Sequence, residues 1–126
     1  MKFAPTNLPA ESKYPKLIRD RIPEIIKKRT GRLPLQKIAG SDSEFLKYLL
    51  KKIREESAEL EHSIHVGNTK EELADILEII DAVLKLKGWK IKNIISIQKE
   101  KRRKNGGFEK RIIMLKALAQ SKRGKK

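Results

Sequence analysis

The fold is decided by residues 41–88, which read SDSEFLKYLLKKIREESAELEHSIHVGNTKEELADILEIIDAVLKLKG. Each half of this stretch opens with the Ser/Thr-x-x-Glu pattern of a capping box, beginning at Ser41 and at Thr69. Each half closes on a glycine, Gly67 or Gly88, the residue that most readily adopts the left-handed conformation after a helix. The pattern therefore predicts two antiparallel helices joined by a tight turn.

Apolar residues recur at helical spacing in both predicted helices, 43–64 and 69–87. The stripe residues are Leu46, Leu49, Leu50, Ile53, Leu60 and Ile64 in the first helix, and Leu73, Ile76, Leu77, Ile80 and Leu84 in the second. We expect the two stripes to pack together as the core of a helix pair. Ile79 and Leu86 fall off the second stripe and need cover, which predicts a homodimer or higher homo-oligomer that completes a four- or five-helix bundle.

The rest of the chain favours a mainly all-α fold. A short helix is expected over 22–29, and a third, basic helix over 91–104. The segments 33–38 and 108–118 each leave room for a short strand, so a minor strand pair is compatible with the pattern.

Length and composition limit the architecture further. A chain of 126 residues allows one compact domain, expected over 14–118, with an irregular arm at 1–13 and a disordered basic tail at 119–126. There is no cysteine, which excludes disulfides and thiolate metal sites. No apolar run of membrane-spanning length and no secretory leader pattern is evident, so we expect a cytoplasmic protein with no membrane partner.

Charge is distributed very unevenly along the chain. The formal net charge is +15, and residues 99–126 alone hold 12 Lys or Arg against 2 Glu. Residues 55–81, in contrast, hold nine acidic residues and one basic residue. A nucleic-acid-binding protein has no use for this acidic island, whereas an enzyme that holds a metal–phosphate complex needs both signs of charge.

Four of these acids are expected to converge. At roughly 100° per residue, the pairs Glu56/Glu59 and Glu72/Asp75 leave their apolar stripes on the same angular side, while Glu55 points outward. Two carboxylates about 5 Å apart repel by roughly 3 kcal/mol at an effective dielectric constant near 20, so a cation is needed. Oxygen ligands without His or Cys favour Mg²⁺, with Mn²⁺ as an alternative. Either motif alone is typical of a solvated helix face, but the matched pair favours a metal site.

The spacing Glu55-Glu56-x-x-Glu59, twelve residues, Glu72-x-x-Asp75 resembles the EExxE…ExxD signature of the all-α NTP pyrophosphatase superfamily, which includes MazG, dimeric dUTPases and phosphoribosyl-ATP pyrophosphohydrolase. Residues 14–24, YPKLIRDRIPE, are similar to the opening Y-x-K-L-V-R-D-K-I-P-E of its MazG-like, phosphoribosyl-ATP-pyrophosphohydrolase-like house-cleaning members. Residues 101–111, KRRKNGGFEKR, are similar to their closing K-x-[KR]-x-R-G-G-F-E-K-R, although Asn105 stands where that motif has Arg.

The resemblance implies Mg²⁺-dependent hydrolysis of the α–β phosphoanhydride bond of a nucleoside triphosphate, giving a monophosphate and pyrophosphate, in the house-cleaning of non-canonical nucleotides. The implied metal ligands are Glu56, Glu59, Glu72 and Asp75. The implied catalytic residues are Glu55, Glu56 and Glu59, with Glu55 orienting the attacking water. The implied substrate-binding residues are Lys16, Arg19, Arg21, Lys101 and Arg103.

A second interpretation comes from a different functional class. The basic segment 99–126 and the pI of about 10.1 are typical of a small helical nucleic-acid-binding protein. Aromatic residues make up only 5% of the chain, which leaves few platforms for base stacking. We therefore place nucleic-acid binding second to a nucleotide pyrophosphatase.

Overall fold

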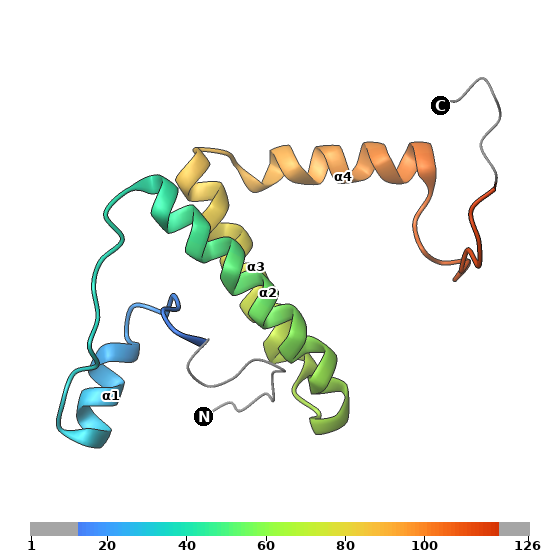
Figure 1. Ribbon diagram of the computed structural model, residues 1–126. Coiled ribbons are helices and arrows are strands. Elements are labelled where there is room, and N and C mark those ends of the chain that lie inside the picture. Colours follow the sequence, from blue (N-terminus) through green and yellow to red (C-terminus); the bar gives the residue numbers. More distant parts are fainter. Residues whose placement is uncertain (1–12, 119–126) are drawn as a thin grey trace. The chain divides into compact units, whose positions relative to one another are not determined.

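The computed structural model describes residues 13–118, and the regular elements in this range are all helices (Figure 1). Its elements are α1 (Ile22–Thr30), α2 (Asp42–Val66), α3 (Thr69–Lys87) and α4 (Ile91–Asn105). The prediction of a mainly all-α protein is confirmed. Between residues 13 and 118, no helix combines the length and apolar character that a membrane crossing requires.

The two segments considered as strands, 33–38 and 108–118, are irregular in the structure. Pro34 removes a backbone donor from the first of them, and no strand is present within residues 13–118 to pair with either. The predicted tail at 119–126 lies outside the described residues, as does the predicted arm at 1–13 apart from Lys13.

The chain divides into two compact units, one that ends at Ile91 and one that begins at Lys92. The first contains α1, α2 and α3, and the second contains nearly all of α4 and the residues that follow it. The domain expected over 14–118 thus spans both units. Within the first unit, α2 and α3 run side by side and antiparallel (Figure 1).

Local hydrogen bonds explain where α2 begins. The Ser41 hydroxyl accepts a hydrogen bond from the Glu44 backbone N–H at 3.1 Å, which satisfies one of the open donors of the first turn. The Glu44 side chain turns back and accepts from the Gly40 N–H at 2.6 Å. Lys37 lies 2.7 Å from the same carboxylate and, together with that backbone hydrogen bond, holds the pKa of Glu44 below its usual value. The capping box predicted at Ser41 is therefore present, with Gly40 as its second donor. The one predicted at Thr69 is absent: Thr69 is already the first residue of α3, and Asn68, the N-cap residue, makes no side-chain capping hydrogen bond.

Replacing Ser41 with alanine should lower the free energy of unfolding by about 1 kcal/mol, because the Glu44 N–H loses its acceptor. Urea denaturation measures the change. Ser57→Ala, an exposed position inside α2, is the matched control and should be neutral or slightly stabilising. Equal stabilities for the two variants would contradict the capping role.

The seam between α2 and α3 contains acids as well as apolar residues. On α2, the buried residues Leu49, Glu56 and Ser63 recur every seven positions. On α3, Glu72 and Ile79 repeat the same interval. A seven-residue repeat keeps one face of a helix turned toward its partner. Each helix therefore places a carboxylate directly in the interface between the two.

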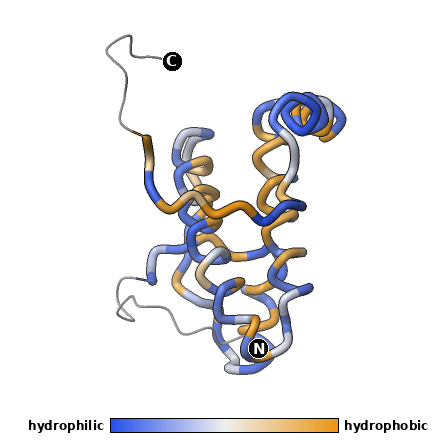
Figure 2. Tube along the Cα trace, turned by 90° about the vertical axis from the view of Figure 1, so that its right-hand side faces the viewer, coloured by the Kyte–Doolittle hydropathy of each residue, from blue (hydrophilic) through white to orange (hydrophobic). Residues whose placement is uncertain are grey.

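The predicted core stripes are correct only in part. Leu49 and Leu84 are buried, but Leu50, Ile64, Leu73 and Leu77 are exposed, with Leu77 at 64%. The remaining stripe residues are half-buried: Leu46, Ile53, Leu60, Ile76 and Ile80. The predicted stripes follow the apolar residues of each helix. The buried faces of α2 and α3 instead lie roughly 60–100° around the helix axis from these stripes, on the side of the acids. Figure 2 shows hydrophobic and hydrophilic residues alternating along both helices.

Candidate metal centre

Three carboxylates from two helices meet inside the seam. Glu56 and Glu59 come from α2 and Glu72 from α3, and one carboxylate oxygen of each lies within 4.8 Å of the others. Glu56 is 3% exposed and Glu72 is fully buried, while Glu59 is half-buried. Burying an ionised carboxylate is costly unless a cation or hydrogen bonds compensate it. The cluster is therefore a candidate functional site.

Two polar neighbours support the carboxylates. The Lys52 ammonium lies 3.7 Å from Glu56 Oε2 and 3.4 Å from Glu55 Oε1, and its side chain is largely shielded from solvent. The Asn68 amide donates a hydrogen bond to Glu72 Oε2 at 3.3 Å. Lys52 therefore balances part of the negative charge of Glu55, Glu56, Glu59 and Glu72, and a divalent cation would balance more of it.

The donor set fits Mg²⁺ or Mn²⁺. Oxygen ligands about 2.1 Å from Mg²⁺ lie roughly 3–4.2 Å apart in an octahedron, depending on whether they are adjacent or opposite. The cluster's oxygens, within 4.8 Å of one another, need only small side-chain adjustments to reach that spacing. Because only carboxylate oxygens are present in the cluster, its chemistry suits a hard cation better than zinc.

Asp75, the fourth predicted ligand, is not a member of this cluster. It lies one turn after Glu72 on α3, and its Oδ1 accepts a hydrogen bond from the Arg19 guanidinium at 2.8 Å. The structure therefore brings together three of the four acids expected to converge. The fourth is engaged by a cation of the chain itself.

The Arg19 contact joins the opening motif to the acidic motif across 56 positions of sequence. A second anchor lies nearby in the chain, where the Lys51 ammonium on α2 donates to the Pro15 carbonyl at 2.6 Å. Lys16 is half-buried with its ammonium 5.3 Å from the centre of the Tyr14 ring, and Arg21 is exposed at the start of α1. Two cations predicted to bind substrate, Lys16 and Arg19, thus belong to the segment that these contacts hold against α2 and α3.

Glu55 does not point outward as expected. Its side chain is 15% exposed and lies beside Lys52. The reason is that the buried face of α2 lies on the side of the acids and not on the predicted apolar stripe, which also explains why several stripe residues are exposed. Lys52 and Asn68 also belong to the site, although the sequence pattern did not predict them. Each lies four residues before the carboxylate it contacts, Glu56 or Glu72, and this helical spacing could have indicated the contact.

The closing motif lies in the second unit. Lys101 is exposed on α4, and Arg103 forms a two-point ion pair with Glu100 at 3.1 and 2.6 Å. This ion pair lowers the pKa of Glu100, so the partner of Arg103 stays ionised. Gly106 ends the helix in the left-handed conformation, with φ of 86°. A side chain at Gly107 would meet only the ends of the Arg102 and Glu109 side chains, which pair with each other and are exposed enough to move aside. The left-handed conformation therefore explains Gly106, whereas Gly107 has no such requirement.

Comparisons with family models, with curated proteins and with solved structures give no match for this chain. The case for a function therefore rests on the chain's own residues. These are the three clustered carboxylates, of which Glu56 and Glu72 are buried, their Lys52 and Asn68 neighbours, and the Arg19–Asp75 ion pair beside them.

Proposed function

We propose that this protein is a Mg²⁺-dependent nucleoside triphosphate pyrophosphohydrolase that removes non-canonical nucleotides by cleaving the α–β phosphoanhydride bond. The observation that carries the proposal is the cluster of Glu56, Glu59 and Glu72 at the seam between α2 and α3, in which Glu56 and Glu72 are buried and Glu59 is half-buried. The resemblance of the acidic, opening and closing motifs to the all-α NTP pyrophosphatases supports the same activity.

Each group has a defined part in the proposed reaction. Glu56, Glu59 and Glu72 would hold Mg²⁺, which supplies charge neutralisation at the phosphates and makes water more acidic. Glu55 orients the attacking water and takes its proton. As the water oxygen bonds to the α-phosphorus, the bond from that phosphorus to the α–β bridging oxygen breaks, and pyrophosphate leaves with the electron pair. No protein nucleophile is required.

Cations of the chain complete the charge balance. Arg19, now paired with Asp75, presents a planar guanidinium that suits a bidentate contact with phosphate. Lys16 and Arg21, in the same unit as the cluster, are the other proposed phosphate contacts, whereas the roles of Lys101 and Arg103 in the second unit stay a prediction of the resemblance. Since phosphoryl transfer depends mainly on positioning and charge neutralisation, these side chains should affect both binding and rate.

A pyrophosphate-release assay over canonical and modified nucleoside triphosphates tests the proposal. We expect release with Mg²⁺ or Mn²⁺ and none after chelation of the metal. Failure to release pyrophosphate from every triphosphate, by a folded protein with Mg²⁺ present, would overturn the proposed activity.

We also propose that two copies of the chain associate through the exposed apolar side chains of α2 and α3. The supporting observation is the small core: of the described residues, only the apolar side chains Leu49, Ile79 and Leu84 are buried. A second helix pair placed on Leu50, Leu73 and Leu77 would complete a four-helix bundle and add the missing apolar burial.

Leu77→Asp should therefore convert a dimer into a monomer, because it places a charge in the proposed apolar interface. Sedimentation at micromolar concentration measures the change. Leu35→Asp, at a fully exposed position outside both helices, is the matched control and should leave the dimer intact. A wild-type chain that is a stable monomer at this concentration would contradict the assembly.

Nucleic-acid binding is kept as a second candidate because of one feature of α4. The helix is exposed along its whole length and carries three consecutive basic residues, Arg102, Arg103 and Lys104, in its last turn. Such a surface is suited to a phosphate backbone, with affinity that falls steeply as salt rises. Tight, salt-sensitive RNA binding without any pyrophosphate release would reverse the order of the two candidates.

A further inference from the structure

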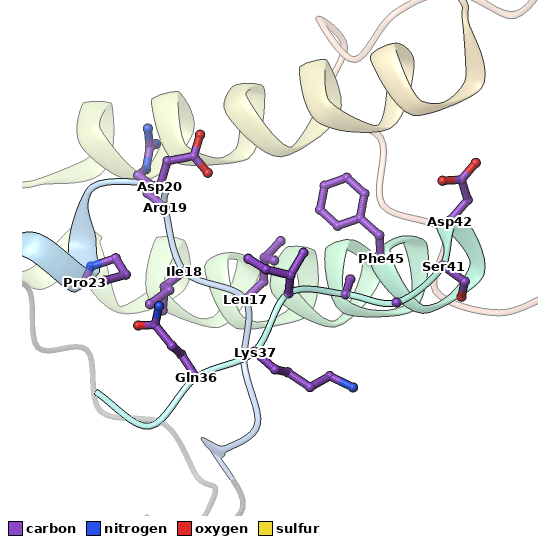
Figure 3. Close-up of a pocket in the computed structure, with 13 residues that line it drawn as sticks. Leu17, Ile18, Arg19, Asp20, Pro23, Gln36, Lys37, Ser41, Asp42 and Phe45 are labelled. Atoms are coloured by element: carbon purple, nitrogen blue, oxygen red, sulfur yellow. The ribbon is translucent and has the colours of Figure 1, made fainter. Parts of the chain in front are cut away.

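A cavity of about 550 Å³ lies beside the candidate metal centre, inside the first unit (Figure 3). Three segments form it: residues 17–23 of the opening motif, residues 36–41, and the first turn of α2. Its apolar lining includes Leu17, Ile18, Pro23 and Phe45. Its volume is within the usual range of small-molecule sites, about 300–1,000 Å³.

We infer that this cavity holds the nucleobase end of the nucleotide, an inference that rests on the proposed function. Phe45 offers an aromatic face on which a planar heterocycle can stack, a contact worth about 1–3 kcal/mol per base. The Gln36 amide, also in the lining, can both donate and accept hydrogen bonds, as base edges require. Small-molecule sites combine apolar surface with polar groups that orient the ligand, and this lining contains both.

The charges around the cavity determine which end of the nucleotide enters it. Both cations of the lining are paired, Lys37 with Glu44 at 2.7 Å and Arg19, at one end of the cavity, with Asp75 at 2.8 Å. Asp20 and Asp42 also line the cavity and would repel phosphate. The cavity is therefore suited to an uncharged group.

Arg19 connects the cavity with the carboxylates. It lines the cavity, and its guanidinium also lies 2.8 Å from Asp75, one turn along α3 from Glu72. Figure 3 shows the Arg19 side chain and the Phe45 ring toward opposite ends of the cavity, both directed toward α3. Arg19 can therefore contact the phosphates of a nucleotide whose base stacks on Phe45, on the side of the cavity where α3 carries Asp75 and Glu72.

Two polyphosphate ligands, one with a nucleoside and one without, test the inference. One is α,β-methylene-ATP, which cannot be cleaved at the α–β position, and the other is inorganic tripolyphosphate. Calorimetric titration in Mg²⁺ should show that Phe45→Ala weakens binding of the nucleotide analogue at least tenfold and changes tripolyphosphate binding less than twofold. Phe108→Ala, at an exposed phenylalanine of the second unit, is the control and should change neither.

Phe45→Leu keeps most of the apolar volume and guards against loss of the fold, which circular dichroism checks. It should also weaken the analogue selectively. The inference is overturned if the two Phe45 variants bind both ligands as tightly as the wild type does. It is also overturned if the variants lose affinity for both ligands equally, as they would if a second copy of the chain filled the cavity. If the wild-type protein binds neither ligand with Mg²⁺, the proposed function fails together with the inference. If it binds both ligands equally well, the phosphate site stands and only the base site fails.

Discussion

Glu72→Gln should reduce Mg²⁺-dependent pyrophosphate release at least 100-fold while leaving the protein folded. The substitution keeps the size of a fully buried side chain and its hydrogen bond with Asn68, but it removes one anionic ligand. Loss of a preorganised electrostatic contact of this kind commonly costs two to three orders of magnitude in rate. Glu56→Gln and Glu59→Gln should behave alike, because both residues belong to the same cluster. Initial rates of pyrophosphate release measure the effect.

Glu78→Gln is the matched control for this series. Glu78 lies on the same helix as Glu72 but is exposed, so its loss of charge should change the rate less than twofold. Equal effects at Glu72 and Glu78, whether both are harmless or both are damaging, would show that the buried position of Glu72 has no special part in the reaction.

Mg²⁺ should stabilise the folded protein by about 2.7 kcal/mol when present at a hundredfold excess over its dissociation constant, because the cluster exists only in the folded state. For a chain of this size the shift in melting temperature is about 10 °C. Glu59→Gln should abolish most of this gain. Without metal the same variant should be as stable as the wild type or more so, since each like-charge pair in the cluster costs roughly 3 kcal/mol.

Calorimetry at fixed ionic strength measures both effects of the metal. The control replaces MgCl₂ with NaCl, which screens charge without occupying the cluster. If NaCl raises the melting temperature as much as MgCl₂ does, or if Glu59→Gln responds to Mg²⁺ like the wild type, the metal assignment is wrong.

The helices themselves could be predicted from short stretches of sequence. Ser41 and Gly67 place the ends of α2 within two residues of the prediction, and Gly88 does the same for α3. Capping hydrogen bonds and left-handed glycines act over only a few residues, so a linear pattern is enough to find them. The acids of the metal centre could be found for a similar reason: their spacing of three residues and their common angular offset depend only on helix geometry.

The direction of the seam could not be found in this way. A wheel that treats every apolar residue as core assigns Leu50 and Leu77 to the interior and leaves Ile79 outside, whereas the structure does the reverse. The seam instead contains Glu56 and Glu72, which break the rule that interfaces between helices are apolar. Local rules usually fail where function overrides packing, so this failure is consistent with a functional site.

The long-range contacts were also beyond the sequence pattern. Arg19 and Asp75 are 56 residues apart, and no periodicity relates them. The cavity needs three separate segments, and its lining includes Gln36 and Phe45, neither of which belongs to a motif. Such features depend on how the chain from residue 17 to residue 41 folds back over the helix pair, which is a tertiary property.

The most direct test of the proposed activity is to identify the bond that is broken. Phosphorus-31 NMR of a nucleoside triphosphate incubated with the protein and Mg²⁺ resolves the products, and water enriched in oxygen-18 labels the phosphorus that is attacked. The account predicts nucleoside monophosphate and pyrophosphate, formed only when the metal is present. An intact triphosphate, or a nucleoside diphosphate with inorganic phosphate, would contradict it.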